Sequence, residues 1–457
     1  MTTAVLAFCL VLAGMAFHLG RGWALAAGGG GRLNSRPFYH GAYVAICAAL
    51  PAAILMLSWP ALEPGLLQVL LAADAAPLAR DMGGAGRSVL WDDARQIANG
   101  RELGRPVSDA MRAFAADYAA AELRLRIGFG AAIASLAVAG FYFARRRVAR
   151  SFRARQAVER VVTAGLILCA LVAVLTTVGI VLSLLFETAR FFALVPVEEF
   201  LFGTTWSPQI ALRADQVGST GGFGAVPLFT GTLLISAVAL FVAGPIGLAS
   251  AIYLAEFAPP RQRATLKPLL EVLAGIPTVV YGFFAALTVA PLVRALGEAA
   301  GFDVASESAL AAGLVMGVMV IPSVSSLSDD VINAVPQNLR EGSYALGATQ
   351  AETILRVVLP AALPGIVGAF MLAISRAIGE TMIVVMAAGL TGNLTGNPLQ
   401  AVTTVTVQIA TLLVGDQEFD NPKTLAAFAL GLTLFLATLA LNVAALLVVK
   451  RYREQYD

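Results

Sequence analysis

The sequence predicts an all-α membrane protein, a polytopic bundle of about nine helices that each cross a lipid bilayer. Of the 457 residues, 58% are hydrophobic and only 13% are charged, a balance that cannot cover the surface of a soluble fold. The apolar residues gather in separate runs of roughly 20, the length that spans a bilayer. The basic residues stand at the ends of these runs and not along one face, so we expect contact with membrane lipids and no nucleic acid.

Nine apolar runs define the predicted helices. They lie near residues 3–20, 41–59, 125–144, 161–186, 227–255, 269–296, 307–326, 365–390 and 423–449. No basic residue precedes the first run, so we expect a retained helix and not a signal peptide, although Ala24-Leu25-Ala26 resembles a cleavage site.

The distribution of Arg and Lys orients these helices. Residues 145–160 are the most basic stretch of the chain and are expected in the cytoplasm, whereas the loop 390–422 has no Lys or Arg and is expected outside. An odd number of spans then places the N-terminus outside the cell inner (plasma) membrane and the C-terminus in the cytoplasm. The other basic positions expected inside are Arg21, Arg32, Arg36, Arg261, Arg263, Lys267, Lys450, Arg451 and Arg453.

Two polar insertions suggest a division of the chain. Residues 60–124 mix Arg with Asp and Glu and carry Ala-rich helical spacing, which predicts a solvated helical cap in the periplasm. A second outside loop, residues 187–226, is aromatic and Gly-rich, and we expect Phe200, Phe202 and Trp206 to anchor it at the membrane surface or against a partner. We therefore predict an N-terminal transmembrane extension at 1–150 and a core at 151–457.

Several kinds of chemistry are unsupported. The cysteines lie inside apolar runs and there are two histidines, so neither a disulfide framework nor a metal centre is expected at Cys9, Cys47, Cys169, His18 and His40. None of the three lysines stands in a G-x-x-x-x-G-K-(S or T) frame. Because this phosphate-binding motif is absent around Lys267, Lys423 and Lys450, any ATP used by this protein would have to be bound by another subunit.

The helices beyond residue 226 carry Gly and Pro in mid-membrane. Examples are Gly244-Pro245-Ile246-Gly247, Gly275-Ile276-Pro277, and the group Gly313, Gly317 and Pro322. Small residues let helices approach closely, and prolines break the hydrogen-bond ladder where a neighbour or a cavity satisfies the freed carbonyls. Together these features favour a moving pathway, although tight packing alone would explain any one of them.

Residues 322–360 are too polar to span a membrane. Their apolar residues fit two short amphipathic helices that meet at Gly347, where a chain reversal needs a residue without Cβ. The Leu359-Pro360 step is expected to interrupt the helix and to set the angle at which the next helix enters the membrane. We therefore predict a cytoplasmic loop over residues 326–364.

The order of residues in this loop resembles a known family. Glu341-Gly342-Ser343, three residues, Gly347, nine residues, Val357, one residue and Leu359-Pro360 resembles the E-A-A-x3-G-x9-I-x-L-P loop of binding-protein-dependent ABC importer permeases. The departures at Gly342, Ser343 and Val357 remain small or isosteric. The resemblance implies a six-helix, MetI-like permease core whose loop couples to a cytoplasmic ATPase. An interfacial amphipathic hairpin would explain the periodicity but not this ordered spacing.

The following helix narrows the resemblance. The segment Arg376-Ala377-Ile378-Gly379-Glu380-Thr381-Met382 resembles R-A-(L or I)-G-E-T-M of PstC, the permease family of phosphate ABC importers, and so do stretches at 200–208, 223–233 and 274–282. Arg376 and Glu380 are four apart, so we expect them on one helix face. A guanidinium stays charged and matches phosphate oxygens, and an ionisable residue in the membrane indicates a substrate path. We place Arg376, Glu380 and Thr381 in that path; an Arg-Glu pair serving only assembly is the alternative.

These resemblances imply a transport subunit and not an enzyme. The chain is expected to form the phosphate path beside a homologous PstA-like permease, a dimer of a PstB-like ATPase that binds ATP and Mg, and a PstS-like periplasmic phosphate-binding protein. This chain itself should bind no cofactor. A permease for another oxyanion, the PstA-type position and a membrane scaffold for phosphate sensing remain alternatives.

Overall fold

The computed structural model describes residues 2–28, 33–81, 86–101, 107–208, 221–414 and 421–452. Within these residues the regular structure is helical apart from one isolated bridge between Trp206 and Phe223. The all-α prediction is confirmed. Nine helices in the described ranges are long and apolar enough to cross a membrane, as many as predicted, so the protein is a multi-pass membrane protein. Arg32 and Arg453 lie outside the described residues.

The chain forms two compact units, Met1–Val174 and Leu175–Asp457, and each is described by itself. The division falls inside one long helix, α6 (Ala154–Phe192), and the predicted boundary at 150/151 lies just before that helix. The other helices of the N-terminal unit are α1 (Thr2–Gly28), α2 (Pro37–Leu70), α3 (Ala72–Asp81), α4 (Gly86–Ala98) and α5 (Asp109–Arg147).

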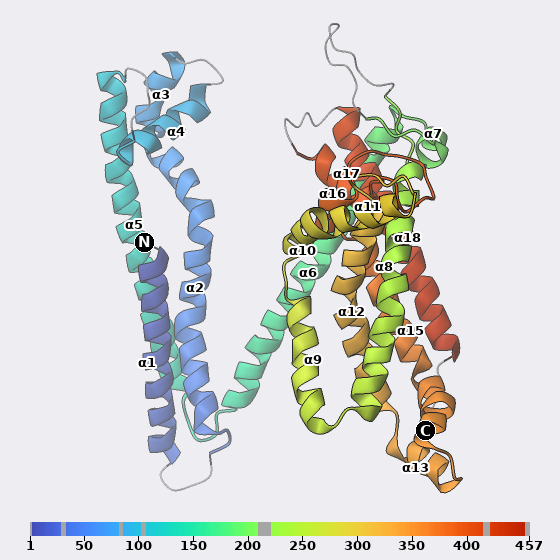
Figure 1. The fold of residues 1–457 in the computed structure, drawn as a ribbon. Helices are drawn as coiled ribbons and strands as arrows, with labels where there is room; N and C mark the ends of the chain where they lie inside the picture. Colours follow the sequence, from blue (N-terminus) through green and yellow to red (C-terminus); the bar gives the residue numbers. More distant parts are fainter. Residues whose placement is uncertain are drawn as a thin grey trace. The chain divides into compact units, whose positions relative to one another are not determined.

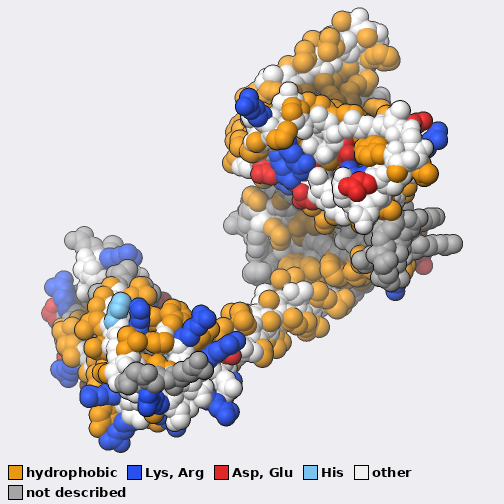
Figure 2. Space-filling model, turned by 90° about the horizontal axis from the view of Figure 1, so that it is seen from below, with side chains coloured by type: hydrophobic (Ala, Val, Ile, Leu, Met, Phe, Trp, Pro, Cys, Tyr) orange, Lys and Arg blue, Asp and Glu red, His pale blue; other side chains and the backbone are white. Residues whose placement is uncertain are grey.

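The N-terminal unit is a bundle of three long helices with a small helical cap. Figure 1 shows α1, α2 and α5 side by side, with α3 and α4 at one end of α2 and α5. The cap has its own core, which includes Leu67, Leu90 and Phe114, and its helical character agrees with the prediction for residues 60–124. At the opposite end of this unit, Lys and Arg side chains gather on the face that Figure 2 shows. The most basic segment, 145–160, lies there.

The second unit is the core bundle. Its elements are α7 (Val197–Phe202), α8 (Val226–Ile252), α9 (Pro260–Ala274), α10 (Thr278–Phe284), α11 (Ala290–Ala299), α12 (Ala309–Ala334), α13 (Gln337–Ala345), α14 (Gln350–Thr353), α15 (Leu359–Ile378), α16 (Met382–Ala387), α17 (Val405–Leu412) and α18 (Pro422–Tyr452). The helices α8 and α12 pack closely because glycines face valines. A Cβ at Gly313 would lie 2.6 Å from Val238 and one at Gly317 2.9 Å from Val242, so both glycines are needed for this approach.

Three π-helical turns in the core each end two residues before a proline. They are η1 (Tyr253–Phe257), η2 (Ala285–Val289) and η3 (Ile354–Val358), followed by Pro259, Pro291 and Pro360. Proline has no N–H and its ring clashes with the carbonyl four residues earlier, and a wider turn relieves that clash. The expected interruption at Leu359-Pro360 is therefore wrong, because the chain stays helical from Gln350 to Ile378.

Two predicted single helices are broken in the structure. The run 269–296 divides at Gly275-Ile276-Pro277 into α9 and α10, because a residue before proline is disfavoured in a helix. The Tyr281 hydroxyl donates to the Leu273 carbonyl at 2.9 Å, satisfying a group near that break. The run 365–390 divides at Gly379 into α15 and α16. Figure 1 shows α9 along the bundle and α10 and α11 across it.

Candidate functional site

Arg376 lies in the last turn of α15 and faces α12. Its side chain is exposed, and Nη1 donates to Ser323 Oγ at 3.2 Å. Among the described residues, no carboxylate lies within ion-pair distance of this guanidinium. Ser323 begins a hydroxyl-rich stretch of α12, in which the buried Ser325 and Ser328 hydroxyls have no hydrogen-bond partner among those residues. The structure therefore places an unpaired positive charge beside the Ser323 hydroxyl.

Glu380 does not share a helix face with Arg376, and that expectation is wrong. The helix α15 ends at Ile378, and Gly379 is its C-terminal cap. Glu380 follows in non-helical backbone, 9% exposed, and its Oε1 accepts hydrogen bonds from the backbone N–H groups of Met382 at 3.0 Å and Ile383 at 3.3 Å. The carboxylate thus satisfies the free N–H groups at the start of α16, the usual role of an acceptor at a helix N-terminus.

Thr381 lies in the same break. It precedes α16, is half-buried, and its hydroxyl is 3.5 Å from the carbonyl oxygen of Gly379. All three predicted path residues therefore stand at the junction of α15 and α16. Sequence reasoning missed a fourth contributor, Thr406 of α17, whose hydroxyl donates to the Glu380 carbonyl at 2.8 Å. Residues 390–422 were predicted as a loop, so the short helix α17 was not expected. The local signal for it was Thr404, whose hydroxyl caps the helix, before an apolar segment.

The segment around Trp206 is held by a buried hydrogen-bond junction at Gln408. Gln408 Oε1 accepts from Trp206 Nε1 at 2.9 Å, and its Nε2 donates to the Leu390 carbonyl at 2.8 Å and to Thr403 Oγ1 at 3.3 Å. Phe200 is 0% exposed and Trp206 is 7% exposed, while Phe202 is 76% exposed. Membrane-surface anchoring is therefore wrong for Phe200 and Trp206, which pack in the core cluster between α7, α17 and α18.

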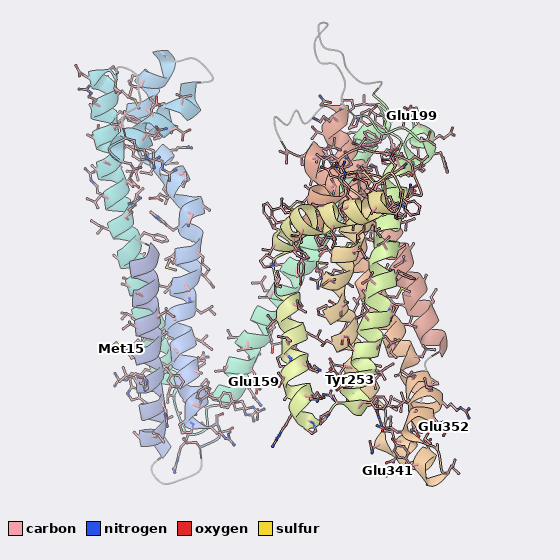
Figure 3. All side chains as sticks on the ribbon, viewed as in Figure 1. Met15, Glu159, Glu199, Tyr253, Glu341 and Glu352 are labelled. Atoms are coloured by element: carbon pink, nitrogen blue, oxygen red, sulfur yellow. The ribbon has the colours of Figure 1, made fainter. Side chains whose placement is uncertain are left out.

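The predicted coupling loop is a helical hairpin. The helices α13 and α14 meet at Gly347, whose φ of +85° requires a residue without Cβ. A capping box between Thr349 and Glu352 starts α14, and Ser343 Oγ lies 2.9 Å from Thr353 Oγ1 across the hairpin. Figure 3 shows Glu341 and Glu352 at the end of the core opposite Glu199.

The side of the hairpin that faces away from the bundle is open. Glu341 and Gly342 are exposed, and a Cβ at Gly342 would meet nothing within 4 Å. Tyr344 is 43% exposed and Leu346 is 90% exposed, which leaves an apolar tip beside the acidic residue. Val357 and Leu359 are half-buried against the bundle and Pro360 is exposed. The loop therefore presents one free surface and holds the other against the core.

Ion pairs that the sequence analysis did not foresee hold α9 to the C-terminal end of α12. Asp329 has a side chain 1% exposed and accepts from Arg263 Nη2 at 2.9 Å and Lys267 Nζ at 2.8 Å. Lys267 also pairs with Asp330 at 2.9 Å. Hydrogen bonds to the two aspartates raise the pKa of Lys267, so it stays charged at neutral pH. The three basic residues of α9 were used only to orient the helix.

Two known protein families match separate parts of the chain. Residues 243–454 match the family described as binding-protein-dependent transport system inner membrane component. Residues 6–176 match a family described as phosphate ATP-binding cassette transporter, and for the part up to residue 150 the sequence analysis predicted only a transmembrane extension with a helical cap.

The alignments of this chain with individual relatives cover most of the length of each relative. The probable ABC transporter permease protein YqgH of Bacillus subtilis (strain 168) is 34% identical over 268 residues, 58% of this chain and 82% of the relative. The phosphate transport system permease protein PstC of Pasteurella multocida (strain Pm70) is 31% identical over 307 residues, 60% and 94% of the two chains. Among solved structures, inward-facing MetNI methionine ABC transporter covers 50% of this chain and 95% of its own at 19% identity, with a TM-score of 0.36.

Proposed function

The chain belongs to the PstC family of phosphate ABC importer permeases, and we propose that Arg376, at the break between α15 and α16, binds phosphate while the hairpin at Glu341 is moved by an ATPase. The protein is a transport component and does not make or break covalent bonds in its substrate. The relatives do not favour a permease for another oxyanion or a sensing scaffold.

The observation that carries the proposal is the unpaired charge of Arg376. A pair serving only assembly would need a carboxylate beside the guanidinium, and within the described residues Glu380 instead caps α16. Guanidinium offers a planar fork of donors that matches phosphate oxygens and stays charged in the membrane. Ser323 Oγ, which now accepts from Arg376, is placed to donate to the same anion.

Glu380 has a second role in this proposal. Its Oε1 accepts from two N–H groups, and no bond to its Oε2 occurs among the described residues. That oxygen is available to accept the proton that HPO₄²⁻ carries and sulfate lacks. Glu380 therefore favours phosphate over a fully deprotonated oxyanion.

The hairpin at 341–360 is the proposed contact with the ATPase. The exposed Glu341, Gly342, Tyr344 and Leu346 form its free surface, which fits a groove in a cytoplasmic partner. ATP and Mg belong to a PstB-like ATPase dimer. A PstA-like permease completes the path, and a PstS-like protein delivers phosphate from the periplasm. In this arrangement the N-terminus is periplasmic and the C-terminus cytoplasmic, in the cell inner membrane.

Uptake of labelled phosphate by cells that lack other phosphate transport tests the proposal. We expect Arg376→Ala to lower uptake by about 10- to 100-fold, since a charged hydrogen bond contributes roughly 1.5–3 kcal/mol. The matched control is Arg294→Ala, which removes an exposed arginine of α11 paired with Glu298 at 2.7 Å and should leave uptake within about twofold. Normal uptake by Arg376→Ala, with the assembled complex intact, would remove Arg376 from the path.

A further inference from the structure

Arg340 is a nearly buried arginine on the coupling hairpin, next to the exposed Glu341. Its side chain is 11% exposed and points back to the bundle, where Nη1 pairs with the carboxylate of Glu256, itself 7% exposed. Its Nη2 donates to the Ile332 carbonyl at 2.8 Å. One guanidinium thus joins α13 to two transmembrane helices, the end of α8 at η1 and the end of α12.

Both acceptors stand at helix ends, where such contacts are most needed. Ile332 lies in the last turn of α12, whose final carbonyls have no partner within the helix. Glu256 lies in the π turn η1, and its backbone carbonyl accepts from Gln350 Nε2 at 2.8 Å. The two arms of the hairpin, α13 through Arg340 and α14 through Gln350, are therefore fastened to the same residue.

We propose that the Arg340–Glu256 pair is the joint through which movement of the coupling hairpin reaches α8 and α12, making both residues positioning residues for transport. This inference rests on the proposed function and adds the point of transmission. A buried pair suits that task because removing either partner leaves an uncompensated charge, so the two elements separate only at high cost. An exposed pair would slip under load, since solvent competes for it.

The joint is connected to the substrate residues through α12. Ile332 and Ser323 are on this one helix, nine residues apart, which is about 14 Å along its axis. Between these two residues Val324, Ser325 and Ser328 are buried, so this part of α12 is packed within the bundle and we expect it to move as one body. A shift at Arg340 therefore displaces Ser323 relative to Arg376 of α15. Figure 3 shows Tyr253, the first residue of η1, toward the same end of the core as Glu341 and Glu352.

Reconstitution of the complete transporter into proteoliposomes tests the joint. The assay records co-purification of the ATPase, ATP hydrolysis with loaded binding protein, and phosphate imported per ATP hydrolysed. For Arg340→Gln we expect the ATPase to remain bound and hydrolysis to continue, while phosphate per ATP falls at least about tenfold. The matched control is Arg261→Gln, which removes an exposed charge of α9 at the same end of the core and should leave the ratio unchanged.

The double variant Glu256→Arg with Arg340→Glu separates the pair from each residue alone. Because the swapped charges can pair again, the double variant should recover a large part of the phosphate imported per ATP hydrolysed. Glu256→Arg alone should be as uncoupled as Arg340→Gln. A normal ratio in Arg340→Gln, or loss of ATPase binding in proportion to loss of transport, would overturn the inference. If Arg340→Gln did not assemble, recovery of assembly and ratio together by the double variant would still support the joint, and an assembled but uncoupled double variant would refute it. Failure of the unmodified protein to import phosphate would instead contradict the proposed function.

Discussion

The surroundings of arginine differ between the coupling hairpin and the α15–α16 break. At the hairpin, Arg340 is nearly buried, pairs with Glu256 and donates to the Ile332 carbonyl, and on α9 Arg263 pairs with the buried Asp329. At the α15–α16 break, Arg376 is exposed and donates to a neutral hydroxyl, that of Ser323. Paired charges fix elements to one another, whereas an unpaired charge in a membrane is retained for a ligand. In the proposed function, the paired arginines belong to coupling and the unpaired arginine to the path of the substrate.

Charge reversal at the path gives the largest expected effect. Arg376→Glu should lower phosphate uptake by about 100-fold or more, equivalent to roughly 2.7 kcal/mol, because a carboxylate repels the anion where a guanidinium would bind it. Uptake by whole cells measures it. Arg155→Glu is the control, because it changes an exposed arginine that pairs with Glu159 one helical turn away, and it should leave uptake nearly unchanged. Equal losses in both variants would erase the contrast.

Removal of the charge of Asp329 should act on stability. Asn in its place leaves Arg263 and Lys267 without their shared carboxylate, and we expect a loss of about 2–4 kcal/mol after discounting for the partial exposure of both cations. Thermal unfolding of the purified complex measures it. Asp330→Asn is the matched control, because Asp330 is 62% exposed and should cost less than about 1 kcal/mol. Two equal shifts would show that burial does not matter here.

The junction at Gln408 should matter for stability and less for coupling. Gln408→Leu keeps the volume but leaves the buried Trp206 indole N–H without its acceptor, a cost of about 1–3 kcal/mol. The exposed Gln400 supplies the control, and Gln400→Leu should change the unfolding temperature little. A Gln408→Leu variant as stable as the parent would show that water replaces the lost bonds.

The hairpin departures from the family pattern should have the smallest effect. Gly342→Ala restores the alanine of the pattern at a site open to 4 Å, and a helix gains about 0.5–1 kcal/mol from this change, so uptake should stay within about twofold. Gly347→Ala instead places a side chain at φ +85° and should cost about 1–2 kcal/mol. Co-purification of the ATPase compares the two. Similar behaviour would mean that the turn at Gly347 is not strained.

The helix count and the hairpin could be predicted because their signals are local. An apolar run and the glycine at 347 each lie in one continuous stretch of sequence, and the nine candidate spans within the described residues and the turn agree with them. The breaks at Gly275-Ile276-Pro277 and at Gly379 were visible as residues but not as interruptions, since apolar composition continues through both. At Pro360 the error was the opposite one: a break was expected, but the helix continues because the π turn before Pro360 accommodates the proline ring.

The pairings that define the site are not local. Glu256 and Arg340 are 84 positions apart, and Trp206 and Gln408 are 202 apart, so no periodicity connects them. Glu380 shows the limit at short range, since its spacing from Arg376 predicts a shared face only if the helix continues. Gly379 ended that helix and turned a candidate ion-pair partner into a cap.

The most direct test of the central claim is the reactivity of Ser323→Cys, which keeps Arg376 and places a thiol beside its guanidinium, prepared with Cys9, Cys47 and Cys169 replaced by Ser. Its modification by a small thiol reagent is timed in the assembled transporter with and without phosphate. If phosphate occupies this point of the path, it should slow modification by about tenfold or more, and sulfate at the same concentration should not. A modification rate that is the same with phosphate, with sulfate and with neither would contradict the account.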